Sequence, residues 1–316
     1  MEFHDEGELS AFLGIKIEQK GENEFYLSQP GLIAKVLEAA GMADCNPNAT
    51  PSSQEPLGPD LEGDKMDETW EYALIIGMLM YLANNTRPDI AYAVHSCARY
   101  THHQRKSHGT AVKHILRYLK GTADKGMVIK PNMEQTLDCY VDSDVGGNYP
   151  VYPDQDPNST KSRSGYVILF QGCPTLWVLK MQTQCALSTM ESKYLALSQS
   201  MRDLIPLWEV LKEINEVEFN KQVLNPKCVM NSKSFSDIVS DASESPIPKI
   251  KVYEDNNACL KFARLPHLTP RTKHIAVPYH WFRSKVEQLE ISIEPISTDN
   301  QLANQFTKSF LPLTSS

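Results

Sequence analysis

The second half of the chain alternates between strand-like and helix-like segments, and this alternation limits the possible fold more than any other feature. Short apolar runs predict strands at 137–141, 164–170, 175–179, 250–254 and 291–296. Helical spacing predicts helices at 188–216 with an interruption at Pro206, at 256–264, at 277–288 and near 301–309. This order, after an initial strand meander, predicts an α/β fold with one mixed sheet and flanking helices.

The first 130 residues have a different pattern. Alternating residues at 15–19 and a strand at 25–27 predict a hairpin, and a helix is expected at 31–40 with Gly41 at its end. Residues 46–68 are rich in Pro, Ser and acids, which is typical of a linker. Helical spacing then returns at 70–84, 88–101 and 109–121, so we expect a small helical subdomain. Residues 148–163 and 225–248 are expected to be a loop and an insert.

Composition excludes several classes of protein. The longest apolar run, at 72–83, is too short to span a bilayer, which takes about 20 residues. No signal peptide is visible, and the seven cysteines form no C-x-x-C pair. We therefore expect no membrane association and a reducing compartment, the cytosol or the nucleus.

Charge is distributed unevenly. The net charge is −8, so the chain as a whole is not a basic nucleic-acid-binding protein. Residues 99–125, however, carry seven Lys or Arg against one acid, Asp124. The candidate contacts to nucleic acid are Arg99, Arg105, Lys106, Lys113, Arg117 and Lys120. Two interpretations stay open: a surface that faces phosphates, or an ordinary solvated helix face.

Three acids lie where predicted strands end or a helix begins. Asp142 follows the strand at 137–141, Glu191 lies in the first turn of the long helix, and Asp255 follows the strand at 250–254. Carboxylates that converge in this way suit two Mg²⁺ or Mn²⁺ ions, which would activate water for phosphodiester cleavage. The alternative for Glu191 is a favourable interaction with the helix dipole.

Short motifs occur along nearly the whole chain. The first group is FLGIKI at 12–17, YLSQ at 26–29, GMLMYL at 77–82, TRPDIAYAV at 86–94 and ILRYLKGT at 115–122. The second group is YVDSD at 140–144, KSRSGYV at 161–167, ALSTME at 186–191, DN at 255–256, RTKHI at 271–275 and QLANQFTK at 301–308. The first group resembles the reverse transcriptase segment, and the second the RNase H segment, of copia-type retrotransposon polyproteins.

The resemblance implies an RNase H-type endonuclease that hydrolyses RNA in RNA–DNA hybrids with two Mg²⁺ or Mn²⁺ ions. Asp142, Glu191 and Asp255 match the first three metal-binding carboxylates of that family, and Asn304 stands where the family has a fourth acid. An amide brings no charge, so the second ion is expected to bind more weakly. Two further departures are Lys193, where an E-x-E-Y pattern has its second Glu, and Ala276, where an Asp is usual.

The resemblance also implies a domain layout. Residues 1–130 would be the C-terminal part of a reverse transcriptase, with a palm hairpin at 12–29, the linker at 46–68 and a thumb-like helical part at 70–125. Residues 135–310 would be the RNase H-like domain. The acids of the polymerase site precede the FLGI motif in that family, so we expect no DNA synthesis. The hairpin edge is expected to lack sheet partners and to have low stability.

A second hypothesis belongs to another class of function. The departures at Asn304, Lys193 and Ala276 favour a degenerate, catalytically inactive retroelement protein that binds nucleic acid through residues 99–125 without cutting it. An upstream polymerase segment of a related polyprotein is a further candidate partner.

Overall fold

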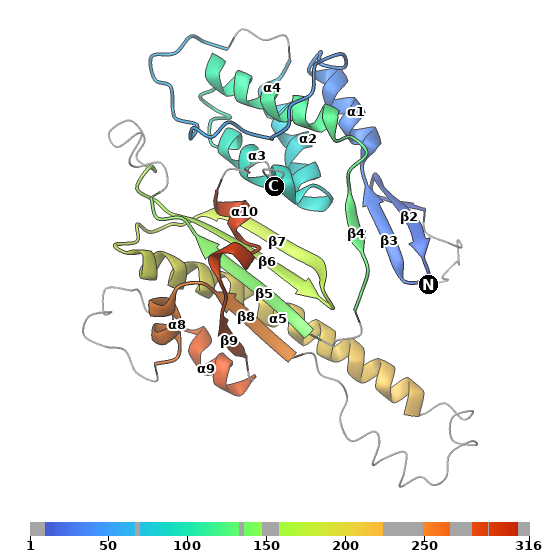
Figure 1. Ribbon diagram of the computed structural model, residues 1–316, viewed down its shortest axis with the longest axis vertical. Helices are drawn as coiled ribbons and strands as arrows, with labels where there is room; N and C mark the ends of the chain where they lie inside the picture. Colours follow the sequence, from blue (N-terminus) through green and yellow to red (C-terminus); the bar gives the residue numbers. More distant parts are fainter. Residues whose placement is uncertain are drawn as a thin grey trace.

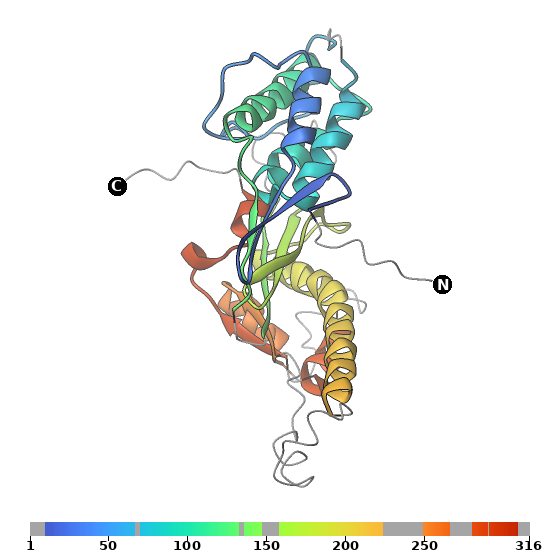
Figure 2. The same ribbon diagram turned by 90° about the vertical axis from the view of Figure 1, so that its right-hand side faces the viewer.

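The computed structural model describes residues 10–66, 70–132, 136–146, 158–223, 249–265, 280–289 and 291–308. The chain is a mixed α/β protein with two sheets and several helices (Figure 1). A helical part at one end of the molecule packs against the larger sheet, as two perpendicular views show (Figures 1 and 2). The α/β class expected from the sequence is therefore confirmed.

The larger sheet has five strands in the order β7-β6-β5-β8-β9. Its strands are β5 (Thr136–Ser143), β6 (Arg163–Phe170), β7 (Cys173–Met181), β8 (Lys249–Glu254) and β9 (Ser292–Pro295). β5, β8 and β9 run parallel, whereas β6 and β7 are antiparallel to their neighbours. The predicted mixed sheet is confirmed, and each predicted strand is present within a few residues.

Helices cover both faces of this sheet. On one face, α5 (Thr189–Val223), α8 (Asn257–Ala263) and α9 (Phe282–Gln288) share a hydrophobic core with alternate residues of β5 and β8. On the other face, α10 (Asn304–Thr307) lies on β6. A side chain at Gly165 would collide with Phe306 of α10, so this close approach depends on the glycine.

The predicted interruption of the long helix at Pro206 is wrong. α5 runs through Pro206 without a break, and Figure 2 shows it as a single curved helix. A proline inside a helix removes one backbone hydrogen bond and favours bending. Here the apolar side of α5, which includes Leu204, Ile205 and Trp208, is buried on the sheet, and this packing offsets the cost.

The smaller sheet has four antiparallel strands in the order β1-β2-β3-β4. They are β1 (Ala11–Phe12), β2 (Ile15–Gly21), β3 (Glu24–Ser28) and β4 (Met127–Ile129). The expectation that the hairpin lacks sheet partners is wrong, because β4 returns along the chain to pair with β3. Gly126 allows this return, since a side chain there would collide with the Leu27 carbonyl oxygen.

The helical part contains α1 (Pro30–Ala39), α2 (Tyr72–Asn85), η1 (Pro88–Ile90), α3 (Ala91–Ala98) and α4 (Lys106–Gly121), close to the predicted ranges. The predicted linker is irregular but packs on these helices. The Tyr100 hydroxyl donates to the Leu57 carbonyl at 3.1 Å, and the Asn48 amide donates to the Arg117 carbonyl at 3.2 Å.

The helical part and the five-stranded sheet share one hydrophobic core. Val167, Leu179 and Phe306 belong to the same cluster as the buried residues of α2 and α3. The Trp177 indole N–H donates to the Ala83 carbonyl at 2.8 Å, which ties β7 to α2. The two predicted parts of the chain therefore stabilise each other.

Some predictions lie outside the described residues. These are most of the loop at 148–163, the insert at 225–248, the RTKHI motif at 271–275, Ala276 and the beginning of the helix expected at 277–288. Among the helices that the structure does describe, none has the length and apolar character needed to cross a membrane.

Candidate functional site

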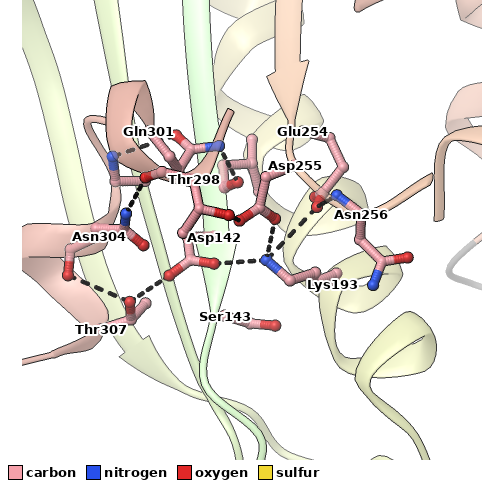
Figure 3. Close-up of polar contacts among 12 residues, drawn as sticks. Asp142, Ser143, Lys193, Glu254, Asp255, Asn256, Thr298, Gln301, Asn304 and Thr307 are labelled. Carbon is pink, nitrogen blue, oxygen red and sulfur yellow. Dashed lines mark hydrogen bonds and ion pairs between the residues drawn. The ribbon is translucent and has the colours of Figure 1, made fainter. Parts of the chain in front are cut away.

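Asp142 and Asp255 meet at one edge of the five-stranded sheet. β5 and β8 are parallel neighbours in the register Tyr140 to Tyr253, so Asp142 and Asp255 occupy equivalent positions two residues further on. Asp142 is 2% exposed, and Asp255 is partly buried. The predicted convergence of these two acids is present in the structure (Figure 3).

Lys193 of α5 lies between the two aspartates. Its Nζ is 2.6 Å from Asp142 Oδ1, 2.5 Å from Asp255 Oδ1 and 3.6 Å from Glu254 Oε1. Figure 3 shows its ammonium pointing into this group of acids. Lys193 is 6% exposed and Glu254 is fully buried. The centre of the site is thus a buried lysine with three acidic side chains around it.

Glu191 does not take the place predicted for it. Its Oε2 accepts a hydrogen bond from the Leu187 amide at 2.8 Å, in the turn that begins α5. Residues two positions apart on a helix do not share a face, so Glu191 cannot point where Lys193 points. Within the described part of the chain, no three His, Cys, Asp or Glu side chains are arranged to hold a metal ion. Lys193 occupies the position beside Asp142 and Asp255 that was expected for the carboxylate of Glu191.

Asn304 lies at the rim of the site, but its side chain is engaged elsewhere. Its Nδ2 donates to the Thr298 carbonyl at 2.6 Å, and its Oδ1 accepts from Lys308 Nζ at 3.1 Å. The contact that α10 makes with Asp142 comes instead from Thr307, whose hydroxyl donates to Asp142 Oδ2. The Thr298 hydroxyl donates to Asp255 Oδ2 at 3.0 Å.

Gln301 holds the ends of the two central strands together. Its buried Nε2 donates to the Val141 carbonyl at 3.0 Å and to the Tyr253 carbonyl at 3.3 Å. The sequence reasoning did not place Gln301, Thr298, Thr307 or Glu254 at the site. Their contacts depend on the approach of the C-terminal segment to β5 and β8, which no local pattern encodes.

The electrostatics of the site favour a charged lysine. Burial acts to lower the pKa of Lys193, but the charges of Glu254 and Asp142 outweigh it and raise this pKa above its usual value. Burial also acts to raise the pKa of Asp255, but the hydrogen bond from Lys193 outweighs it and lowers that pKa. Burial raises the pKa of Glu254 to about 8, against the opposing charge of Lys193. Lys193 therefore remains an ammonium at neutral pH.

The residues present do not fit the two divalent ions that the family resemblance implies. Magnesium ions lie about 2.0–2.1 Å from carboxylate oxygens, so an ion shared by Asp142 and Asp255 would need the space that Lys193 Nζ fills. The ammonium would also repel that ion. Glu191 and Asn304, which were predicted to be the other two metal ligands, form hydrogen bonds with the backbone of Leu187 and Thr298 instead.

The predicted basic surface forms mainly one face of α4. Lys106, Arg117 and Lys120 are exposed on it, and Lys113 is half-buried between them. Lys106 forms one long, exposed ion pair with Asp64 at 3.8 Å. Arg105 precedes the helix and Arg99 follows α3.

His108 does not belong to this surface. It is buried and stacks on Tyr100 with 4.2 Å between the ring centroids. The helix α4 lies beyond α2 and α3 from the five-stranded sheet (Figures 1 and 2).

Comparisons with known proteins identify the class of this chain. It is 29% identical over 301 residues to the retrovirus-related Pol polyprotein from transposon RE2 of Arabidopsis thaliana, covering 95% of this chain and 18% of that protein. It is 30% identical over 311 residues to the corresponding polyprotein from transposon TNT 1-94 of Nicotiana tabacum, covering 96% and 21%. The polyprotein from transposon RE1 of Arabidopsis thaliana is 29% identical, covering 96% and 18%.

No protein-family model and no solved structure gives a significant match. The relatives are Pol polyproteins of transposons, and the resemblance found in the sequence is to the copia type. The chain belongs to the copia-type retrotransposon Pol polyproteins, and it spans about a fifth of the length of these relatives.

Proposed function

We propose that this protein has an RNase H-like domain at 135–310 and that the protein binds RNA–DNA hybrids without hydrolysing them. The observation that carries the proposal is the ammonium of Lys193, which occupies the space between Asp142 and Asp255. The mixed sheet with flanking helices and the similarity to Pol polyproteins support the RNase H-like assignment.

The lack of hydrolysis follows from the state of the acids. RNase H-type hydrolysis requires carboxylate oxygens that are free to hold divalent ions. Asp142 accepts from Lys193 and Thr307, and Asp255 accepts from Lys193 and Thr298. Each of the two acids therefore has both oxygens engaged by groups of the protein itself.

Hybrid binding is attributed to the exposed cations of α4. Lys106, Arg117 and Lys120 point into solvent at the spacing of one helix face. A hybrid offers a row of phosphates, and cations that neutralise them release counterions and so gain affinity at low salt. The net charge of −8 confines such binding to a local surface.

The second candidate is two-ion hydrolysis by Asp142, Glu191, Asp255 and Asn304. The convergence of Asp142 and Asp255 at neighbouring strand ends favours it. It would require Lys193 to leave the site and Glu191 to enter it.

A single assay separates the two candidates. A hybrid with a labelled RNA strand is titrated with the full chain at several salt concentrations, and its cleavage is followed in Mg²⁺ and in Mn²⁺. Salt-dependent binding with intact RNA is the expected result. RNA products that disappear in an Asp142→Asn variant would show hydrolysis, and an absence of binding at low salt would contradict the binding function.

A further inference from the structure

Asp142, Asp255 and Glu254 lie around the ammonium of Lys193, so the protein fills the space between these acids with a cation of its own. We propose that the position between Asp142 and Asp255 is a divalent-cation site occupied by the ammonium of Lys193, and that a single substitution of Lys193 opens it to Mn²⁺. This inference deepens the proposed function and rests on its premise that the ammonium of Lys193 occupies the space between the two aspartates.

Oxygens of three acids surround the ammonium of Lys193. Nζ has oxygens of Asp142 and Asp255 at 2.6 and 2.5 Å and an oxygen of Glu254 at 3.6 Å. These oxygens come from β5 and from the end of β8, so the sheet itself fixes their separation. Carboxylate oxygens held in this way are the ligands that Mn²⁺ and Mg²⁺ prefer.

A second observation points to a missing partner at the same place. Glu254 is fully buried, and its Oε2 has no hydrogen-bond partner. A buried carboxylate oxygen without a partner is costly, and it is therefore available to a cation that enters. Lys193 is too far from Glu254, at 3.6 Å, to satisfy that acid fully.

The acids do not depend on Lys193 for their positions. Thr307 holds the second oxygen of Asp142, Thr298 holds the second oxygen of Asp255, and the Asn256 amide donates to Glu254 Oε1 at 3.0 Å. Loss of the ammonium would leave the carboxylates of Asp142 and Asp255 aimed at one point without a compensating charge. Their mutual repulsion would favour the uptake of a divalent ion.

The substitution Lys193→Glu suits this uptake in size as well as in charge. A glutamate side chain is one heavy atom shorter than lysine, so its carboxylate would stop short of the present position of Nζ. The space that Nζ leaves could then take an ion with the new carboxylate as an additional ligand. Lys193→Ala opens the same space without adding a ligand.

The test uses Mn²⁺ alone, without nucleic acid, so that it can fail separately from hybrid binding. Binding is measured by calorimetry and by the EPR signal of free Mn²⁺ for wild type, Lys193→Glu and Lys193→Ala. We expect Lys193→Glu to bind Mn²⁺ at least about ten-fold more tightly than wild type and its melting temperature to rise with Mn²⁺. Lys193→Ala should show a smaller gain, because it supplies one ligand fewer.

Two control variants make the result specific. Lys180→Glu applies the same charge change at an exposed position of β7 and should bind Mn²⁺ no better than wild type. Lys193→Glu combined with Asp142→Asn removes a proposed ligand and should lose the gain. Mn²⁺ binding by wild type as tight as by Lys193→Glu would overturn the proposal, as would a folded Lys193→Glu protein that binds no better than wild type. If the variants are unfolded in EDTA, refolding on addition of Mn²⁺ supports the proposal and a lack of refolding overturns it.

Discussion

Lys193 and the basic residues of α4 carry the same charge in opposite environments. Lys193 is buried at the sheet edge among three carboxylates, whereas Arg117 and Lys120 point into solvent from a helix that lies beyond α2 and α3 (Figure 1). A buried cation is fixed by its acids and contributes to the fold, whereas an exposed cation remains available to a partner. The predicted roles were catalysis at the site of Asp142 and Asp255 and nucleic-acid binding at α4. In the structure, the first region holds the ammonium of Lys193 and the second presents exposed cations.

The largest expected effect comes from removing the buried cation, Lys193. Lys193→Met keeps an unbranched side chain that is one heavy atom shorter, but it leaves Asp142, Asp255 and Glu254 without their shared cation. Because removal of one partner strands buried charges, we expect the free energy of unfolding to fall by about 3–5 kcal/mol. Guanidinium unfolding in EDTA measures this change. Lys180→Met, at an exposed position of β7, should cost less than about 0.5 kcal/mol, and an equal loss in both variants would contradict the account.

His95 adds a third case to the comparison, because burial keeps this basic side chain uncharged. Burial, together with the charge of Arg163, lowers the pKa of His95 from 6.5 to about 4. The unfolded chain therefore binds a proton between these values while the folded chain does not, and stability present above pH 6.5 is lost as the pH falls towards 4.

We expect this loss to amount to about 2 kcal/mol and to be absent in His95→Phe. Unfolding curves at pH 4.5 and pH 7 give the change in the free energy of unfolding for wild type and for His95→Phe. Subtracting one change from the other isolates His95, because the other titrating groups contribute equally to both proteins. His102→Phe replaces an exposed histidine after α3 and should keep the wild-type slope. A His95→Phe protein with an unchanged pH dependence would show that His95 is protonated in the fold.

The smallest effect concerns the exposed side of the comparison. The double variant Arg117→Gln/Lys120→Gln should weaken hybrid binding about ten-fold near physiological salt and make the slope of log K against log salt shallower by about 2. Its free energy of unfolding should change by less than about 0.5 kcal/mol. Fluorescence anisotropy over a salt series measures both quantities. Lys180→Gln/Lys261→Gln removes two exposed charges elsewhere and should leave the affinity nearly unchanged.

Much of the fold could be predicted because its pattern is local. The strands of the five-stranded sheet and the helices of the first half have clear periodicity, and the ends of β5 and β8 placed Asp142 and Asp255 together. β4 could not be predicted in this way, because three residues carry no pattern. Its pairing with β3 depends on contacts about 100 positions apart in the chain.

The identity of the third group at the site could not be obtained from acids alone. Glu191 and Lys193 are two residues apart, and only the packing of α5 decides which of them faces β5 and β8. One signal was available: Lys193 lies four residues before Leu197 and eight before Met201, both buried on the sheet. A lysine in line with that apolar stripe predicts a buried, paired ammonium.

The central claim is that Lys193 takes the place of a divalent ion between Asp142 and Asp255. The most direct measurement is a crystal structure of the full chain grown with Mn²⁺, with data collected for the anomalous signal of manganese. The account predicts no anomalous peak between the two aspartates and Lys193 Nζ within hydrogen-bond distance of both. A manganese peak bound by Asp142 and Asp255, with the lysine turned away, would contradict it.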